Sequence, residues 1–317
     1  MSSLPKEKDY ADRSLILKIL GLLLLIAGIG FGILAPLETY CYYLFSQEGS
    51  FHYEGFGFGS FMFANITGQI VAYYGLAVIG IVLGYGHWNI RKWARRLTAA
   101  LLWTWVVVGA PLTAGAAFLF LGQKDPSIAA AATATGFFGF CYLILPWLLI
   151  RFYKGRNVRR TFEAHDLTNS WIEDLPMPIL VLSALFVFFA VVIHMLVLFR
   201  GIFPAFGKFL YGIPGILSIA CCTAALLVLL WGTLRRKRWA WWAALIVWGG
   251  FTLSLVVTFI FTRYADLLAE IGFPSREVEI LKSIPLQGYH LALLFGLPCL
   301  AAWVVLLLSK PRFDREK

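Results

Sequence analysis

Residues 179–199 read ILVLSALFVFFAVVIHMLVLF, and this run contains no Asp, Glu, Lys or Arg. An α-helix rises about 1.5 Å per residue, so about 20 apolar residues are enough to cross the hydrocarbon core of a bilayer. The alternation of apolar and polar residues that is typical of a half-buried strand is absent from this run. The segment is therefore predicted to be a membrane-spanning helix.

Seven further segments have the same character, and none of them holds a charged residue. Hydrophobic residues make up 60% of the chain and charged residues only 14%, whereas a soluble domain carries about 25% charged residues. This composition excludes a disordered protein, a disulfide-stapled secreted domain and a soluble nucleotide-binding enzyme. We predict an all-α transmembrane fold, a bundle of eight helices. The other seven spans are 19–37, 61–85, 97–121, 128–150, 210–231, 239–261 and 289–308.

The positions of Lys and Arg predict the orientation, because these residues concentrate in the cytoplasmic loops of membrane proteins. Most of the 27 lie in both terminal segments and in the second, fourth and sixth loops, which an even number of spans places on one side. We therefore predict a multi-pass protein of the inner membrane with both termini in the cytoplasm. The cations expected outside are Lys124, Arg200, Lys208, Arg263, Arg276 and Lys282.

This distribution also accounts for the formal net charge of +10. Cationic clusters beside helix ends can attract anionic lipid headgroups, at about 1 kcal/mol for each residue. The lipid bilayer and its anionic headgroups are thus the partners that the charge predicts, and nucleic-acid binding is not needed to explain it.

A short repeat divides the chain in two. Residues 91–94 read RKWA and residues 236–240 read RKRWA. In each segment, a basic tight turn is followed by Trp-Ala at the start of the next span. Two interpretations remain open, a true internal repeat and the common appearance of any tight cytoplasmic hairpin. A true repeat would give two parallel halves of four spans, related by an axis along the membrane normal. The halves would be 1–150 and 179–317, joined by a cytoplasmic loop at 151–178.

The connecting loop predicts a short surface helix over 156–163, with Pro176 and Pro178 ending any helix before the fifth span. The segment Phe152–Pro178 resembles a loop found in uncharacterised polytopic integral membrane proteins of bacteria. The resemblance covers this loop only, and it implies a bacterial membrane protein without implying any activity.

Polar side chains inside the spans form two candidate ligand-binding faces. Asn65, Gln69 and Tyr73 are spaced by four residues on the second span, and Ser254 and Thr258 have the same spacing on the seventh. The predicted orientation places all of them in the outer half of the bilayer. They could line a polar pocket that opens outward, or they could hydrogen-bond between helices and to their own backbone.

Histidines are the second kind of candidate. His194 lies within the fifth span and His290 at the outer end of the eighth, so the pair could hold a b-type haem or a metal ion. The alternative is a neutral histidine that hydrogen-bonds to a neighbouring helix or sits at the water boundary. His87 and His165 are expected to be solvated on the cytoplasmic side.

Signatures of enzymes are missing, since the chain has no Walker loop, no HExxH and no GxSxG. No span contains the carboxylate that proton- or sodium-coupled transport usually needs. The sequence therefore favours a non-enzymatic structural, assembly or anchoring subunit that contacts other membrane subunits. A transporter or small-molecule binder with an outward polar pocket, and a haem- or metal-binding redox subunit, are the alternatives.

Overall fold

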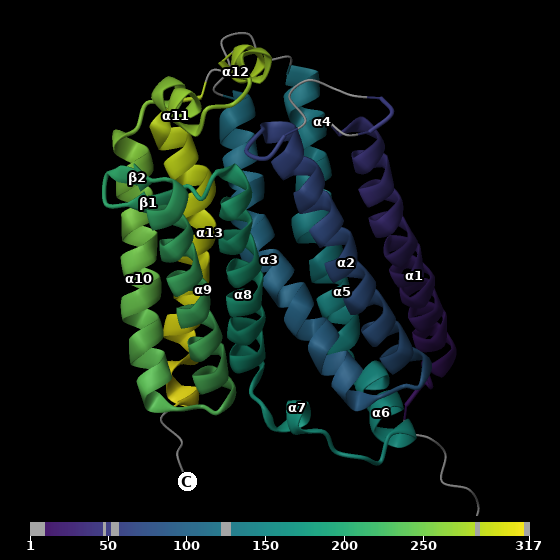
Figure 1. Ribbon diagram of the computed structural model, residues 1–317. Helices are drawn as coiled ribbons and strands as arrows, with labels where there is room; N and C mark the ends of the chain where they lie inside the picture. Colours follow the sequence, from purple (N-terminus) through teal and green to yellow (C-terminus); the bar gives the residue numbers. More distant parts are fainter. Residues whose placement is uncertain (1–9, 47–48, 52–56, 122–127, 283–285, 314–317) are drawn as a thin grey trace, which may run out of the picture.

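The computed structural model describes residues 10–46, 49–51, 57–121, 128–282 and 286–313 (Figure 1). Eight of its helical stretches are long and apolar enough to cross a membrane, so the chain is a multi-pass membrane protein built as a helix bundle. The main helices are α1 (Ser14–Phe45), α2 (Phe61–Trp88), α3 (Lys92–Leu121), α4 (Ile128–Gly139), α5 (Leu145–Lys154), α8 (Met177–His194), α9 (Gly212–Leu234), α10 (Arg238–Phe261) and α13 (Gly288–Ser309).

All eight predicted spans are confirmed as candidate spans, although most helices run further than the apolar stretches. The fourth span is interrupted, because α4 passes through a π-helical turn, η1 (Phe140–Ile144), before α5 begins. Pro146 explains the interruption, since proline lacks the N–H that would continue the α-helical ladder and its ring crowds the preceding turn. The fifth span ends in a 3-10 turn, η2 (Met195–Phe199).

Helices α8, α9, α10 and α13 pack around one hydrophobic core, and α3 joins it from the side (Figure 1). Two tryptophans hold α10 to α13. The indole Nε1 of Trp248 donates to the carbonyl oxygen of Cys299 at 3.0 Å, and that of Trp241 donates to the carbonyl oxygen of Leu306 at 2.9 Å. Both indoles are buried, so each N–H needs such a partner.

Helices α1 and α2 form a hairpin that packs most closely on itself. Gly28 and Gly80 face each other across it, and a Cβ added at Gly28 would lie 2.7 Å from the backbone nitrogen of Ile81. Gly21 and Gly84 make a second close approach about two helical turns closer to the start of α1. Small residues at these positions let the two backbones pack in direct contact, as they do between helices in lipid.

The two ends of the bundle differ. The end at which α1 begins and α13 ends, called the base below, also carries the α2–α3 and α9–α10 turns and two short helices, α6 (Arg156–His165) and α7 (Trp171–Asp174) (Figure 1). The opposite end, the top, carries α11 (Tyr264–Ile271) and α12 (Ser275–Lys282). The short helix predicted after the fourth span is thus confirmed as α6. A last turn, η3 (Lys310–Arg312), follows α13.

The fold is almost entirely helical, as predicted, and among the described residues one short element is not. A β-hairpin of β1 (Phe203–Ala205) and β2 (Lys208–Leu210) precedes α9, with Ala205 paired to Lys208. Its two-residue turn, Phe206 and Gly207, has φ angles of 46° and 95°, the left-handed pair that matches the twist of a tight hairpin. Strands this short carry too little periodicity to be predicted from sequence.

The α2–α3 and α9–α10 turns have the same geometry. In each, a non-glycine residue with positive φ closes the first helix: Ile90 at 49° and Arg236 at 52°. The amide of the next residue donates to the carbonyl oxygen of a glycine five positions earlier, at 2.7 Å from Arg91 to Gly86 and at 3.0 Å from Lys237 to Gly232. This pattern is a Schellman motif.

The same two glycines receive the side chains that open the next helix. A Cβ on Gly86 would lie 2.5 Å from the Cβ of Ala94, and a Cβ on Gly232 would lie 2.6 Å from the Cβ of Ala240. The indoles of Trp93 and Trp239 lie against these glycines in the same way. The two similar sequence segments thus make the same tryptophan and alanine contacts with a glycine of the preceding helix.

Candidate functional site

A network of side-chain hydrogen bonds and ion pairs lies at the base of the bundle. It holds residues 155–175, called the platform below, which cross beneath α2, α3 and α5 (Figure 1). Helix α6 turns Val158, Thr161 and Phe162 inward. Phe162 is fully buried in a small cluster with Leu17 and Ile90, from the start of α1 and the α2–α3 turn. Burial of one face of α6 fixes the platform to the spans.

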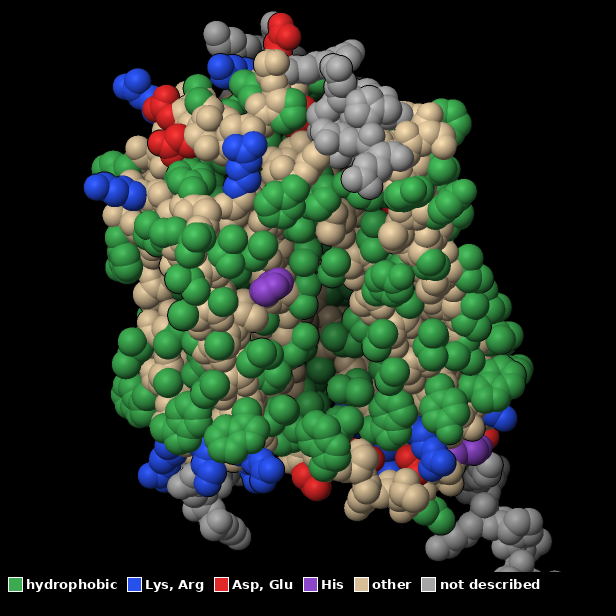
Figure 2. All heavy atoms as spheres, in the orientation of Figure 1, with side chains coloured by type: hydrophobic (Ala, Val, Ile, Leu, Met, Phe, Trp, Pro, Cys, Tyr) green, Lys and Arg blue, Asp and Glu red, His purple; other side chains and the backbone are tan. Residues whose placement is uncertain are grey.

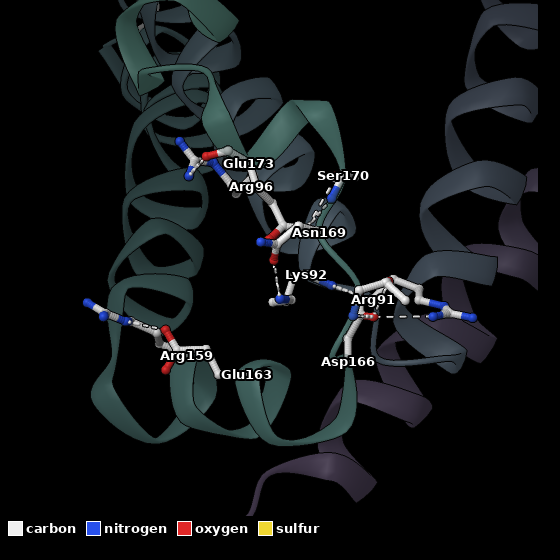
Figure 3. Close-up of polar contacts among 10 residues, drawn as sticks. Arg91, Lys92, Arg96, Arg159, Glu163, Asp166, Asn169, Ser170 and Glu173 are labelled. Atoms are coloured by element: carbon white, nitrogen blue, oxygen red, sulfur yellow. Dashed lines mark hydrogen bonds and ion pairs between the residues drawn. The ribbon is translucent and has the colours of Figure 1, made fainter.

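Asp166, directly after α6, is the central carboxylate of the platform (Figure 3). Its Oδ2 accepts from the backbone N–H of Lys92 at 2.9 Å, and its Oδ1 accepts from Arg91 at 3.2 Å and from the Thr168 hydroxyl at 2.6 Å. Lys92 is the first residue of α3, so Asp166 caps this helix from a distant segment, where a negative charge is favourable.

The environment of Asp166 sets its charge. Burial alone would raise the pKa of this carboxyl group, but the hydrogen bonds from Thr168, Lys92 and Arg91 outweigh it and hold the pKa below its ordinary value. Its side chain is only 1% exposed. A carboxylate that is buried, ionised and fully hydrogen-bonded gives the platform a single position relative to α3.

A second group of contacts fixes the α7 end of the platform (Figure 3). Lys92 Nζ donates to Asn169 Oδ1 at 2.9 Å and lies 3.5 Å from a carboxylate oxygen of Glu173. The Arg96 guanidinium donates to the backbone carbonyl oxygens of Glu173 and Leu175. Ser170 and Glu173 complete a capping box at the start of α7. The basic first turn of α3 thus binds both ends of the segment that follows α6.

A buried histidine corrects the prediction that His87 is solvated. Its ring is fully buried, with Nδ1 2.7 Å from the carbonyl oxygen of Leu83 and Nε2 2.8 Å from the Tyr153 hydroxyl. Because a carbonyl oxygen only accepts, Nδ1 carries the hydrogen and Nε2 accepts from the tyrosine. The pair joins α2 to α5. His165 is exposed as predicted, with Nδ1 2.9 Å from the carbonyl oxygen of Thr161.

The outward face of the platform is partly apolar. Leu167 is 90% exposed and Trp171 is 64% exposed, although both belong to a segment whose backbone is held by Asp166 and Glu173. Lys and Arg side chains also lie along the base (Figure 2). Arg159 donates to Glu163 at 2.8 Å, which lowers the pKa of that carboxyl group. A fixed surface that presents a leucine and a tryptophan within a charged rim can bind another protein.

The first predicted ligand-binding face lies near the top of α2. Asn65 and Gln69 are exposed, and Gln69 Nε2 donates to Asn65 Oδ1 at 3.3 Å. Tyr73 is half-buried, and its ring stacks on Phe31 of α1 with centroids 5.8 Å apart. The predicted spacing therefore produces one polar pair and one aromatic contact in the α1–α2 hairpin.

The second predicted face is covered by the β-hairpin. Ser254 and Thr258 are buried on α10. The Ser254 hydroxyl accepts from the amide of Phe206 and donates to the carbonyl oxygen of Pro204, both at 2.9 Å, and Thr258 Oγ1 accepts from the amide of Gly207 at 3.0 Å. Among the described residues, no hydrogen bond links this face to the Asn65–Gln69 pair.

The two candidate haem or metal ligands have different surroundings. His194 is the last residue of α8 and is exposed. His290 lies in the first turn of α13, where its Nδ1 accepts from the amide of Gln287 at 3.0 Å and its ring lies against Phe118 and Tyr289. Across the described part of the chain, no group of three or more His, Cys, Asp or Glu residues could hold a metal ion.

The fold and this site define a multi-pass helical membrane protein with a polar platform at one end. Comparison of the chain with protein-family models, curated proteins and solved structures found no match. The sequence did not identify Asp166 as a functional residue. The one local signal is its position directly after an amphipathic helix and two residues before a threonine, the arrangement of an Asx turn.

Proposed function

We propose that the chain is a non-enzymatic structural, assembly or anchoring subunit of a membrane complex, and that the platform is its docking surface. The observation that carries the proposal is the exposure of Leu167 on a segment held by a buried carboxylate. A mobile loop can rearrange to bury a leucine side chain, whereas a segment that Asp166 holds in place keeps Leu167 exposed. Tryptophan, leucine and arginine at one rigid surface suit a partner with an apolar pocket and an acidic rim.

We further infer that the base faces the cytoplasm of a bacterial cell and that the protein lies in the inner membrane. The support is the concentration of Lys and Arg at the base (Figure 2), which is typical of the cytoplasmic side. The likeness of 152–178 to a loop of bacterial membrane proteins agrees with this location. Both termini are then cytoplasmic.

We also infer that the bundle consists of two parallel halves of four spans, joined through the platform. The matching Schellman turns after α2 and α9 support this arrangement, because each is followed by the same tryptophan and alanine contacts on a glycine. In this view α2–α3 corresponds to α9–α10. The first half differs in leaving its α1–α2 hairpin largely exposed to lipid or to another subunit.

A transporter with an outward polar pocket is the weaker proposal. Its pocket needs free hydroxyl groups on α10, and the hydroxyls of Ser254 and Thr258 already bond to the β-hairpin. A redox subunit has less support again, because His290 is engaged in capping α13.

The docking proposal is tested by extraction of native membranes in a mild detergent, followed by size separation. Wild type is expected to migrate in a complex larger than one chain in its micelle, and the variant Leu167→Asp/Trp171→Ala to migrate alone. Trp242→Ala is the control, since this tryptophan is also exposed near the base but lies on α10. A wild type that always migrates as a monomer, or a platform variant that stays in the complex, would contradict the proposal.

A further inference from the structure

A groove runs between α3 and the interrupted fourth span, separate from the platform and from both predicted polar faces. It has a volume of about 320 Å³ and is lined entirely by apolar and aromatic side chains. The lining residues are Trp103, Val106, Leu143, Ile144, Trp147 and Ile150. A groove of this composition on a membrane-spanning surface matches a hydrocarbon chain rather than a polar solute.

Two cationic side chains lie at the end of this groove that is nearer the base. The guanidinium carbon of Arg151 lies 5.6 Å from the ring centre of Trp147, and Lys154 Nζ lies 4.9 Å from the ring centre of Trp103. Each cation therefore contacts a tryptophan that lines the groove. These cation–π contacts keep both positive charges beside the groove.

Several cations at the base have an acidic partner, but Arg151 and Lys154 have none among the described residues. Arg91 pairs with Asp166, Lys92 with Glu173, and Arg159 with Glu163. Arg151 and Lys154 are both exposed, and no carboxylate among the described residues lies within ion-pair distance of either. The two positive charges nearest the groove are thus available to an anion.

The order of the cations and lining residues along α5 fits one molecule of lipid. Trp147 precedes Lys154 by about two helical turns, which is about 10 Å along the helix axis. The cations lie where α5 leaves the membrane, and the lining residues follow toward its interior. Headgroup phosphates lie at the first level and acyl chains at the second.

We propose that this groove binds an anionic phospholipid of the leaflet at the base, with one acyl chain along Trp103 and Trp147 and its phosphate between Arg151 and Lys154. Charge complementarity selects the anionic headgroup, because a zwitterionic lipid carries a compensating cation of its own. The assignment of this leaflet to the cytoplasmic side rests on the proposed orientation. Binding itself depends on neither the orientation nor a protein partner.

The test uses the full chain in mild detergent and quenching of tryptophan emission by phosphatidylglycerol brominated on its acyl chains. The signal of the groove is the difference between wild type and Trp103→Phe/Trp147→Phe. We expect saturable quenching, with brominated phosphatidylcholine weaker on the order of tenfold. Arg151→Gln/Lys154→Gln should abolish this preference.

The control Arg235→Gln/Lys237→Gln removes the same charge from two exposed residues of the α9–α10 turn, and it should keep the preference. Val106→Phe fills the groove and should weaken quenching by both lipids, with the thermal unfolding midpoint of each variant confirming its fold. Equal quenching of wild type by the two lipids would overturn the proposal, and so would a preference that survives Arg151→Gln/Lys154→Gln. The assay requires no partner complex, so its failure is distinct from failure of the docking proposal.

Discussion

At the scale of single residues, buried polar groups at the base hold segments together that are far apart in the chain. Asp166 caps α3, and His87 accepts from Tyr153 of α5. At the top, Glu277 of α12 accepts from the amides of Phe61 and Met62, the first residues of α2. Two helices, α2 and α3, are therefore capped by a carboxylate from another element, and in α2 this cap adds to the Ser60 hydroxyl, which accepts from the Phe63 amide.

Replacement of the platform carboxylate tests this account. Asp166→Asn keeps the shape of the side chain but loses the charge that Arg91 and the α3 amide bind, so we expect a loss of about 1–3 kcal/mol in the free energy of unfolding. Glu163→Gln is the matched control, because its partners Arg159 and Arg160 are exposed, and it should cost less than about 1 kcal/mol. Equal effects in reversible unfolding by denaturing detergent would contradict the capping role.

The same carboxylate predicts a dependence on pH. The pKa of Asp166 is lower in the folded protein than in the unfolded chain, so its contribution is complete above the unfolded value, about 3.9, and is lost as the pH falls through the folded value. The difference in unfolding midpoint between wild type and Asp166→Asn should therefore be constant above about pH 5 and shrink below about pH 4. A difference that grows on acidification would contradict the assignment.

At the scale of elements, the two Schellman turns share a backbone but differ in what their left-handed residue does. Ile90 is 2% exposed and packs in the cluster between the platform and the spans, whereas the Arg236 side chain is exposed. A non-glycine residue in this conformation costs about 1–2 kcal/mol. The first turn offsets this strain by burying its side chain, and the second does not.

Substitution by glycine should change the stability in opposite directions at the two turns. Arg236→Gly should raise the stability by about 1 kcal/mol, because glycine adopts positive φ without strain. Ile90→Gly removes a buried side chain, a loss of about 2–5 kcal/mol that exceeds the relief of strain. Thermal unfolding followed by circular dichroism would measure the two signs, and the same sign for both variants would refute this explanation.

The close approach of α1 and α2 predicts different effects of two alanine substitutions in α1. Gly28→Ala places a Cβ against the backbone of Ile81 and should cost about 1–3 kcal/mol. Gly30→Ala adds the same atom to the same helix where no neighbour lies within 4 Å, so it should leave the stability unchanged or raise it by less than about 1 kcal/mol. If the two alanine variants unfold at the same temperature, the close approach of α1 and α2 is not what stabilises the hairpin.

Elements were predictable where a long apolar run decided them. The run 239–261 gave α10 almost to the residue, since lipid imposes length and composition on a span. The β-hairpin was not predictable, because its strands are short and it is held by Ser254 and Thr258 from a distant helix. The outward polar pocket stays a prediction, and equal spacing on a helix did not show that the backbone of Phe206 and Gly207 would bond to these hydroxyls.

At the scale of the whole molecule, local patterns predicted the number of spans, whereas the site depended on tertiary contacts. The connecting loop was identified as a feature, but the burial of Asp166 follows from its contact with the start of α3, and the burial of His87 follows from its contacts with Tyr153 and Phe162. No spacing within the loop encodes these tertiary contacts. The groove beside Trp103 likewise requires α3 and α5 to lie together. Sequence alone therefore located the base without showing which of its polar residues are buried.

The central claim is that the chain crosses the membrane eight times with the platform and both termini in the cytoplasm. Single cysteines placed at Leu167 of the platform and at Glu279 of α12, in a background without the five native cysteines, test it with a membrane-impermeant maleimide. Both positions are exposed. The account predicts that intact cells label Glu279→Cys and leave Leu167→Cys unlabelled until the inner membrane is permeabilised. Labelling of Leu167→Cys in intact cells would contradict it.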